Sequence, residues 1–228
     1  MAPARFTAPI IAKKMLNDYV LEVRFAKPAG FVYEAGQFLQ LLVPGEKAEM
    51  PRSYSLSSTP ADDYLEFGIK LYETGLTMPY LDKTNIGAEV ALRGPFGRFT
   101  NTHADPIVGV ATGVGLVPIV GIARDELLNK KSTTPIKIIF GVRTEADLFW
   151  LDELQALANE HANFTFEVTL TQPSEAWAKL RGRVTEHLTH TDSLTRYFIC
   201  GSPDMVKDVK TKLTGLGAAA SQLHFEIF

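Results

Sequence analysis

Residues 51–59 read Pro51-Arg-Ser-Tyr-Ser-Leu-Ser-Ser-Thr59 and predict a strand in which a cation, an aromatic ring and hydroxyl groups alternate. Successive side chains of a strand point to opposite faces of its sheet. One face is therefore expected to carry an arginine, a tyrosine and a leucine, and the other face three serines. These residues are Arg52, Tyr54 and Leu56 on the first face, and Ser53, Ser55 and Ser57 on the second.

A strand of the core would carry apolar side chains along at least one face, and neither face of residues 51–59 does. Arginine offers a charged fork for a phosphate, tyrosine offers a ring for stacking, and serine offers a hydroxyl donor for a ring nitrogen. The combination predicts a bound flavin nucleotide. The alternative that stays open is an edge strand with a solvated serine face.

Arg52-x-Tyr-Ser55 followed by Leu56-Ser-Ser58 resembles the flavin signature of the ferredoxin-NAD(P) reductase family. The resemblance implies bound FAD and a role for each residue. Ser55 would form a hydrogen bond near the flavin N5 atom, Tyr54 would stack on one face of the ring, and Arg52 would neutralise the flavin phosphate.

Composition limits the class of protein. The chain has 228 residues, 46% of them hydrophobic and 21% charged, so one or two globular domains are expected. The net charge of -3 shows no excess of basic residues of the kind that binds nucleic acid. No apolar run approaches the length of a membrane helix and no signal peptide is recognised, so we expect a soluble, cytoplasmic, monomeric protein with no membrane partner. One cysteine is too few for an internal disulfide or a cysteine-ligated iron-sulfur cluster, and the five histidines show no metal-ligand pattern, so no metal is predicted.

The pattern of apolar residues changes once along the sequence, near residues 100–105. Before this point the apolar residues alternate in short segments, such as residues 65–71, between glycine, proline and aspartate. After it, strand-like runs alternate with helical patterns, which predicts parallel strands with crossover helices. We therefore expect an N-terminal antiparallel flavin-binding β-barrel over residues 1–101, then a doubly wound, parallel-sheet nucleotide-binding domain over residues 102–228, with a cofactor cleft between them.

Residues 70–81 of the barrel half run from a strand through a glycine into a predicted short helix, whose start would offer free amides to an anion. In the family, a Gly-x-x-Ser segment at this place holds the flavin pyrophosphate. The corresponding segment has methionine in place of the serine, and an ordinary helix start is the alternative. The residues are Gly75, Leu76, Thr77 and Met78.

The second half opens with a strand from Ile107, a glycine-rich turn, and a helical pattern that continues through Leu128. This order is the context that a dinucleotide-binding loop requires, because glycines let phosphates approach the backbone at a helix start. The turn Thr112-Gly113-Val-Gly115-Leu-Val-Pro resembles the Thr-Gly-x-Gly-x-x-Pro form of the reductase family. A plain strand-turn-helix unit is the alternative.

Two further segments bear on the coenzyme. Arg143 follows a predicted parallel strand, at an edge where ligands gather. Members of the family that prefer NADP tend to place Ser-Arg where this chain has Thr171-Gln172. NADH is therefore favoured over NADPH, and Arg143 keeps NADPH open as the alternative.

The last two segments also match the family. Cys200-Gly201-x-x-x-Met resembles the segment that places a thiol beside the nicotinamide, and this thiol is not expected to act as a nucleophile. The sequence ends Glu226-Ile-Phe228, which resembles the Glu-Val-Tyr ending of the plant-type reductases with phenylalanine in place of tyrosine. The resemblance implies that Phe228 covers the flavin and that Glu226 lies near the nicotinamide. A buried structural cysteine and a terminal strand that completes a sheet are the alternatives.

Together these segments predict a flavin-dependent NAD(P)H oxidoreductase of the ferredoxin-NAD(P)H reductase type. No cluster-binding domain is recognised, so the first hypothesis for the electron acceptor is a separate ferredoxin, flavodoxin or oxygenase component. A reductase of free flavin or ferric iron is the second. A non-catalytic dinucleotide-binding subunit of a larger redox complex is the third, and the presence of Ser55, Cys200 and Glu226 together argues against it.

Overall fold

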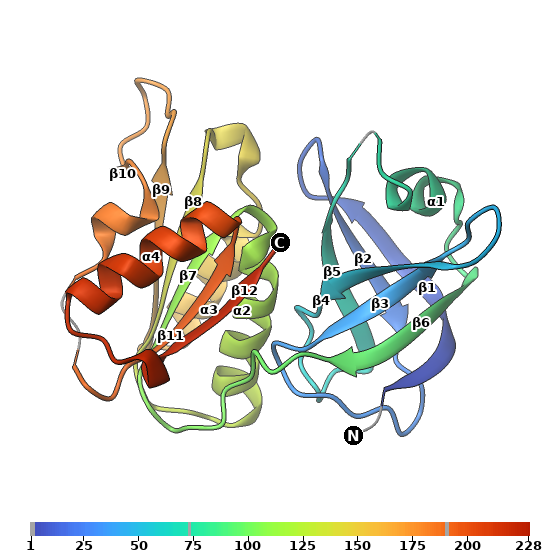
Figure 1. The fold of residues 1–228 in the computed structure, drawn as a ribbon, viewed down its shortest axis with the longest axis horizontal. Coiled ribbons are helices and arrows are strands. Elements are labelled where there is room, and N and C mark those ends of the chain that lie inside the picture. The colour runs from blue at the N-terminus through green and yellow to red at the C-terminus, as the bar shows by residue number, and fades with distance from the viewer. Residues whose placement is uncertain (1–2, 73, 190–191) are drawn as a thin grey trace. The chain divides into compact units, whose positions relative to one another are not determined.

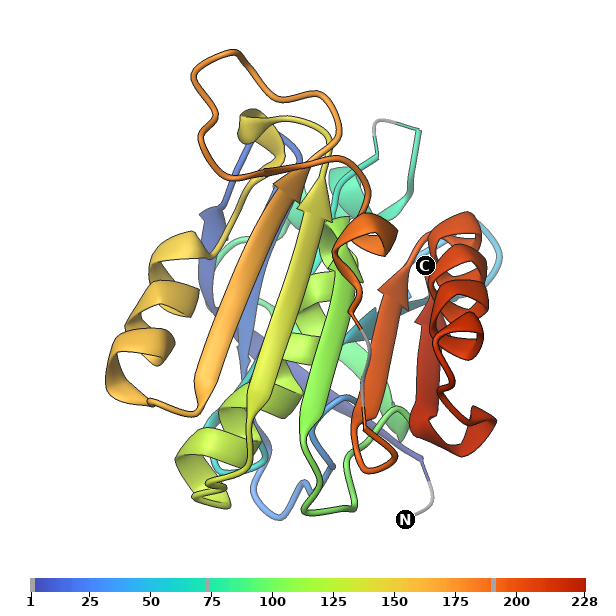
Figure 2. The ribbon, with the colours of Figure 1, turned by 90° about the vertical axis from the view of Figure 1, so that its left-hand side faces the viewer.

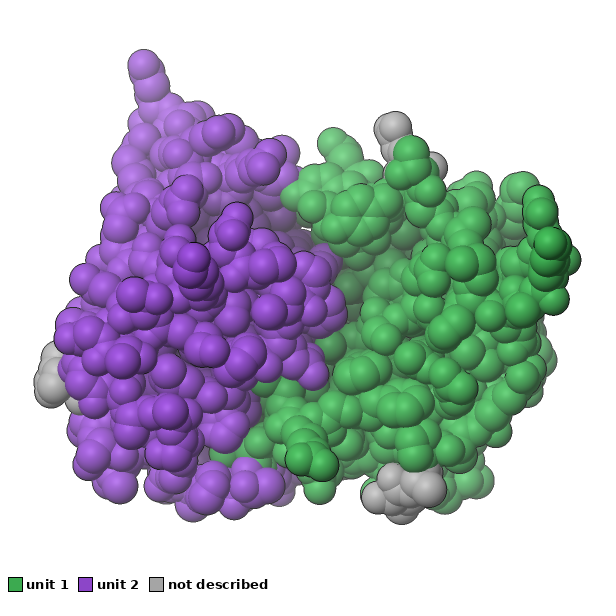
Figure 3. Space-filling view, in the orientation of Figure 1, with its two compact units in different colours: residues 1–101, 120–125 green, residues 102–119, 126–228 purple. Residues whose placement is uncertain are grey.

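The structure is a computed structural model that describes residues 3–72, 74–189 and 192–228. It separates into two compact units, which Figure 3 shows in different colours. The first unit comprises residues 1–101 and 120–125, and the second comprises residues 102–119 and 126–228.

The described part of the first unit is a curled, six-stranded antiparallel sheet, and Figure 1 shows the strands curving around a common interior. The strand order is β4-β3-β6-β1-β2-β5, which confirms the antiparallel, barrel-like fold predicted for the N-terminal half. The strands are β1 (Ala4–Met15), β2 (Val20–Ala26), β3 (Phe38–Val43), β4 (Met50–Ser55), β5 (Tyr64–Lys70) and β6 (Glu89–Phe96), and the helix α1 spans Thr77–Lys83.

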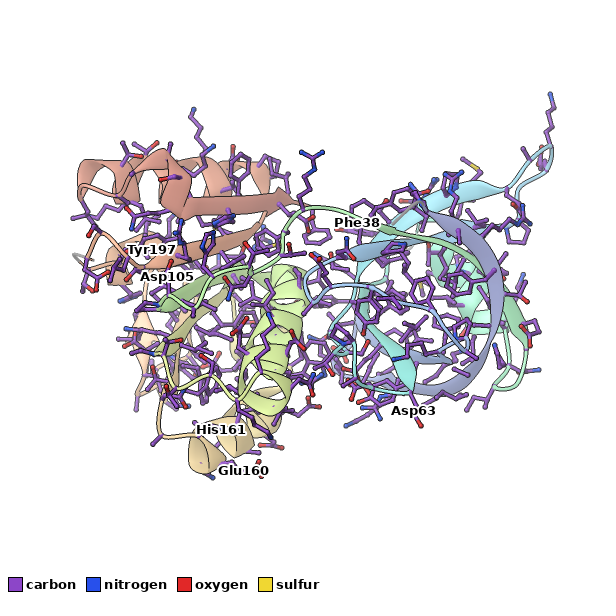
Figure 4. All side chains as sticks on the ribbon, turned by 90° about the horizontal axis from the view of Figure 1, so that it is seen from below. Phe38, Asp63, Asp105, Glu160, His161 and Tyr197 are labelled. Atoms are coloured by element: carbon purple, nitrogen blue, oxygen red, sulfur yellow. The ribbon has the colours of Figure 1, made fainter. Side chains whose placement is uncertain are left out.

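The core of the first unit comes from the alternating residues that the sequence pattern singled out. Phe25 of β2 and Phe67 of β5 are fully buried, and their rings meet edge to face at 5.7 Å between centroids. Burial of each side chain of this size contributes roughly 1.5–3 kcal/mol relative to exposure. Figure 4 labels Phe38 of β3, whose ring stacks on that of Phe96 in β6 at 5.5 Å.

The predicted strand 51–59 is shorter than expected, because β4 ends at Ser55. Leu56 then enters the core and forms an isolated bridge to Phe67 of β5. The Ser57 hydroxyl donates to the buried carboxylate of Glu66 at 2.9 Å. The regular strand predicted for residues 51–59 therefore ends at Ser55, and of its three serines Ser55 and Ser57 are buried whereas Ser53 is exposed.

The described residues of the second unit form a six-stranded parallel sheet of order β10-β9-β8-β7-β11-β12. The chain moves outward from β7 to β9, and then from β11 to β12 in the opposite direction. Right-handed crossovers consequently place helices on both faces of the sheet. Figure 2 shows the strands side by side with α4 on the viewer's side. This arrangement confirms the doubly wound fold predicted for the C-terminal half.

The strands of this sheet are β7 (Ile107–Thr112), β8 (Ile136–Val142), β9 (Phe164–Leu170), β10 (Leu180–Arg181), β11 (Arg196–Gly201) and β12 (Leu223–Ile227). The longer helices are α2 (Leu116–Arg124), α3 (Leu151–Glu160) and α4 (Pro203–Gly215). Short 3₁₀ turns span Gly113–Gly115, Glu145–Asp147, Val184–His187 and Ala220–Gln222.

Helix α2 carries the pattern that predicts a helix through Leu128. Its α-helical part ends at Arg124, and a π-helical turn continues over Asp125–Asn129. The contacts of residues 120–125, at the end of α2, group them with the first unit. Helix α4 begins at Pro203, where the Ser202 hydroxyl accepts a hydrogen bond from the Met205 amide and caps the helix.

Candidate functional site

Ser55, the last residue of β4, has a buried hydroxyl with no hydrogen-bond partner among the described residues. Leaving a buried polar group unpaired costs about 1–3 kcal/mol, so each such group requires an explanation. Its backbone is in register with Phe38 of β3, which fixes the position of the residue in the sheet. A bound ring nitrogen would supply the partner that the hydroxyl lacks, and the site therefore fits a flavin.

Tyr54 lies beside Ser55 on the other face of β4, and its ring is half-buried against the barrel core. Its hydroxyl donates to the Thr77 Oγ1 atom at 2.7 Å. Burial raises the pKa of the phenol and the hydrogen bond that it donates to Thr77 opposes this, so the phenol stays protonated at neutral pH. The bond joins β4 to the first residue of α1, and nothing in the sequence pattern indicates it.

The segment that follows Gly75 differs in detail from the family's serine-containing pattern. Helix α1 begins at Thr77, and Leu76 precedes it without a side-chain cap. Thr77 is buried, whereas Leu76 and Met78 are exposed. The Thr77 side chain is therefore buried at the start of α1. The Met78 side chain, at the position where the family has a serine, is exposed. Arg52 is half-buried and donates to the Pro51 carbonyl at 3.0 Å.

In the second unit, the predicted glycine turn lies at the carboxyl edge of the sheet, where β7 adjoins β11. A Cβ atom on Gly115 would lie 2.2 Å from the Cys200 carbonyl oxygen, and one on Gly201 would lie 2.2 Å from the Thr112 Oγ1 atom. Gly113 has a φ of 53° and open space around it. The structure therefore brings Thr112, Gly113, Gly115, Cys200 and Gly201 together: Gly115 and Gly201 allow the turn and the end of β11 to pack closely, and the open space lies at Gly113.

Cys200 and Glu226 are register partners on adjacent parallel strands, so their side chains share one face of the sheet. Cys200 is fully buried. Burial, and next the nearby Glu226 carboxylate, raise the pKa of the thiol well above its usual value. The thiol is therefore neutral, in agreement with the expectation that it is not a nucleophile. Phe228 is 47% exposed, and its backbone amide donates to the Gly201 carbonyl at 3.1 Å.

Arg143 follows β8 and is exposed, and its guanidinium forms no hydrogen bond or ion pair with any residue that the structure describes. The neighbouring strand end lies close to it, because the Gln172 amide donates to the Arg143 carbonyl at 2.7 Å. Arg181 is a cation that the sequence analysis missed in this region. Its guanidinium donates to the carbonyls of Ser174, Glu175 and Trp177, so it organises the loop after β9.

Residues of both units match known families. Residues 7–101 match the oxidoreductase FAD-binding domain, and residues 110–211 match the oxidoreductase NAD-binding domain. The chain is 31% identical to ferredoxin--NADP reductase B of Sorangium cellulosum over 236 aligned positions, which cover 97% of this chain and 96% of that protein. The chain belongs to the ferredoxin-NAD(P) reductase family. It is thus an oxidoreductase of this type, with an FAD-binding domain followed by an NAD-binding domain.

Two other relatives show how widely the reductase fold is used. The reductase component of propane 2-monooxygenase from Mycolicibacterium goodii is 32% identical over 91% of this chain, which spans 62% of that protein. The crystal structure of the Amycolatopsis cytochrome P450 reductase GcoB superposes with a TM-score of 0.89 and 27% identity, covering 99% of this chain and 70% of that one. The chain therefore spans three fifths to seven tenths of these two proteins.

No group of three or more histidine, cysteine, aspartate or glutamate side chains in the described residues is arranged to hold a metal ion. No helix in the described ranges has the length and apolar character needed to cross a membrane.

Proposed function

We propose that this reductase takes a hydride from NAD(P)H, with NADH favoured, onto bound FAD and passes single electrons to a separate acceptor protein. The observation that carries the proposal is the buried, unpartnered hydroxyl of Ser55 at the end of a strand that also presents Arg52 and Tyr54. When bound, the flavin supplies the redox chemistry, and the protein supplies position and tuning.

On the flavin side, Ser55 would donate a hydrogen bond near N5 of the ring. Tyr54 would present its ring for stacking, with its hydroxyl held by Thr77. Arg52 would pair with flavin phosphate, and the amides of residues 75–78 would lie near the pyrophosphate.

On the coenzyme side, Thr112, Gly113 and Gly115 would receive the coenzyme phosphates, and the open space around Gly113 supports this assignment. Cys200, Gly201 and Glu226 would seat the nicotinamide. The roles of Phe228 as a movable cover and of Arg143 as a phosphate partner are hypotheses that the variants below test.

The acceptor that we propose is a ferredoxin, a flavodoxin or an oxygenase component. The relatives support this class, since one is named as a ferredoxin reductase and another as a monooxygenase reductase component. We further propose that residues 1–101 and 102–228 are the two domains, that the protein is a monomer, and that it works in the cytoplasm.

The first test is the cofactor itself. We expect the purified protein to be yellow, to release FAD and not FMN on heating, and to be reduced anaerobically by NADH. A protein that stays colourless when it is incubated with FAD would contradict the proposal.

Ser55→Ala and Ser53→Ala form a matched pair for the same test. Losing one hydrogen bond of about 0.5–1.5 kcal/mol should slow flavin reduction by roughly 2- to 13-fold in Ser55→Ala. Ser53 is exposed on the same strand, and its replacement should have no effect. Equal rates in both variants would remove Ser55 from the proposed site.

A further inference from the structure

A buried charge cluster lies next to the end of β4. Glu66 of β5 is fully buried, although strand alternation would place it on the solvent face. Its Oε1 atom accepts from Arg124 Nη1 at 2.7 Å and from Ser57 Oγ at 2.9 Å, and its Oε2 atom accepts from Arg24 Nε at 2.7 Å. We call Glu66, Arg124, Arg24 and Ser57 the Glu66 cluster.

The Glu66 cluster fixes the backbone directly after the flavin-facing strand. The Ser57 amide donates to the Glu66 carbonyl at 2.9 Å, and Arg124 donates to the Ser57 carbonyl at 3.2 Å. Helix α2 also lies against this backbone, since a Cβ on Gly121 would be 2.7 Å from the Leu56 carbonyl oxygen. Both hydrogen-bonding groups of the Ser57 backbone are therefore held within the first unit.

Ser55 has no comparable support of its own. Its hydroxyl has no partner among the described residues, so the direction of that hydroxyl depends on the backbone on either side. On one side β4 pairs with β3. On the other side, two residues further on, the backbone is held by the Glu66 cluster.

Glu66 is ionised in this cluster, and Arg124 and Arg24 are its charged partners. Burial alone would raise the pKa of Glu66, but the charge and hydrogen bond of Arg124, followed by Arg24, lower it overall. A buried ion pair often adds little net stability compared with apolar packing, because removing charges from water is costly. Such a cluster can instead hold the backbone in one defined position, even where it adds little to the stability of the fold.

We propose that Arg124, acting through Glu66 and the Ser57 backbone, is a positioning residue that holds Ser55 in place for the flavin. This inference rests on the proposed function, since it requires that Ser55 contacts FAD. Arg124 makes no contact with the flavin in this account and is not a catalytic residue. Nothing in the sequence motif Arg-x-Tyr-Ser indicates its involvement.

Arg24 provides a matched comparison. Arg24→Gln and Arg124→Gln each remove one positive partner from the same carboxylate, but Arg24 forms no hydrogen bond to Ser57 among the described residues. Each variant should lose some thermal stability. Only Arg124→Gln should shift the visible absorption bands of the bound flavin and weaken FAD binding by about tenfold, whereas Arg24→Gln should change the affinity less than threefold.

A double-mutant cycle that combines Arg124→Gln with Ser55→Ala tests whether Arg124 affects the flavin through Ser55. If Arg124 acts through Ser55, adding Arg124→Gln to Ser55→Ala should cause no further spectral shift and less than a threefold further loss of FAD affinity. Additive effects would overturn the proposal, and so would equal shifts in Arg24→Gln and Arg124→Gln. If Arg124→Gln does not fold, Arg124→Lys decides. It keeps the charge but not the fork, so a shifted spectrum supports the proposal and a wild-type spectrum overturns it.

Failure of this inference is distinguishable from failure of the proposed function. Unmodified protein that binds FAD and is reduced by NADH retains the function even if every Arg124 variant has a wild-type spectrum. Unmodified protein that binds no FAD contradicts the function itself.

Discussion

Ser55 and Cys200 are both buried, yet their surroundings give them different chemistry. The Ser55 hydroxyl is buried and has no partner among the described residues. The Cys200 thiol is kept neutral by burial and by Glu226, both of which raise its pKa. Cys200 is therefore suited to packing beside an apolar or aromatic group, and not to attacking one.

Phe228 permits a sharp test at the level of one side chain. If its ring covers the flavin face that accepts the hydride, the nicotinamide has to displace it. A stacked aromatic pair contributes about 0.5–1.5 kcal/mol beyond its buried area. Phe228→Ser should therefore bind the oxidised coenzyme roughly 2- to 13-fold more tightly, release it more slowly, turn over more slowly, and discriminate less between NADH and NADPH.

Ile227→Ser is the control for Phe228→Ser, because Ile227 is an exposed apolar residue that ends β12 and directly precedes Phe228. The dissociation constant for oxidised coenzyme and the flavin absorption spectrum are the two measurements. If both are unchanged in Phe228→Ser, the ring never contacts the flavin and only completes β12.

Among the elements, the glycine turn between β7 and α2 depends most closely on its neighbour. Gly115→Ala would place a methyl group 2.2 Å from the carbonyl oxygen of Cys200. This oxygen is a backbone atom, so it cannot move away by a change of side-chain rotamer. Either the turn or the end of β11 has to move. We predict that coenzyme binding weakens by at least tenfold, about 1.4 kcal/mol, while FAD stays bound to the first unit.

Gly215→Ala serves as the control for the turn. Gly215 is the last residue of α4, and a Cβ there meets no atom within 4 Å. Coenzyme titrations and thermal melts on both variants separate a local effect from general destabilisation. Normal coenzyme affinity in Gly115→Ala would mean that the turn tolerates displacement and does not receive the phosphates.

At the scale of the whole molecule, charge bears on the choice of coenzyme. The chain carries 23 basic and 26 acidic residues, so it offers no long-range attraction for the added charge of a 2'-phosphate. The Thr171-Gln172 segment adds no cation beside the end of β9. We predict a higher kcat/KM for flavin reduction with NADH than with NADPH.

An NADPH advantage of tenfold, about 1.4 kcal/mol, would contradict this prediction and point to Arg143 as the phosphate partner. Arg143→Ser would then lose NADPH activity and keep NADH activity. Arg183→Ser is the matched control, because Arg183 is exposed in the same unit and pairs with Asp208 at 3.4 Å.

Local patterns in the sequence were sufficient for the fold, and they singled out the short segments that make up the candidate site. Alternation in residues 65–71 predicts β5, and the strand-turn-helix order around Gly113 and Gly115 predicts the first crossover of the parallel sheet. These predictions succeed because burying one face of a strand or helix requires apolar residues at a regular spacing, and that spacing can be read from a short stretch of sequence. The short segments around Ser55 and Cys200 were recognised for a similar reason, since each keeps its chemistry within a few consecutive residues.

Contacts between distant segments were decided only by the tertiary structure. The pattern of β5 assigns Glu66 to solvent, yet it is buried because Arg124, 58 positions away, supplies its counter-charge. The Tyr54–Thr77 and Ser57–Glu66 hydrogen bonds likewise depend on partners that no local period encodes. A carboxylate is stable away from water only where charged and hydrogen-bonding groups converge on it. That convergence is a property of the folded chain and not of any one segment.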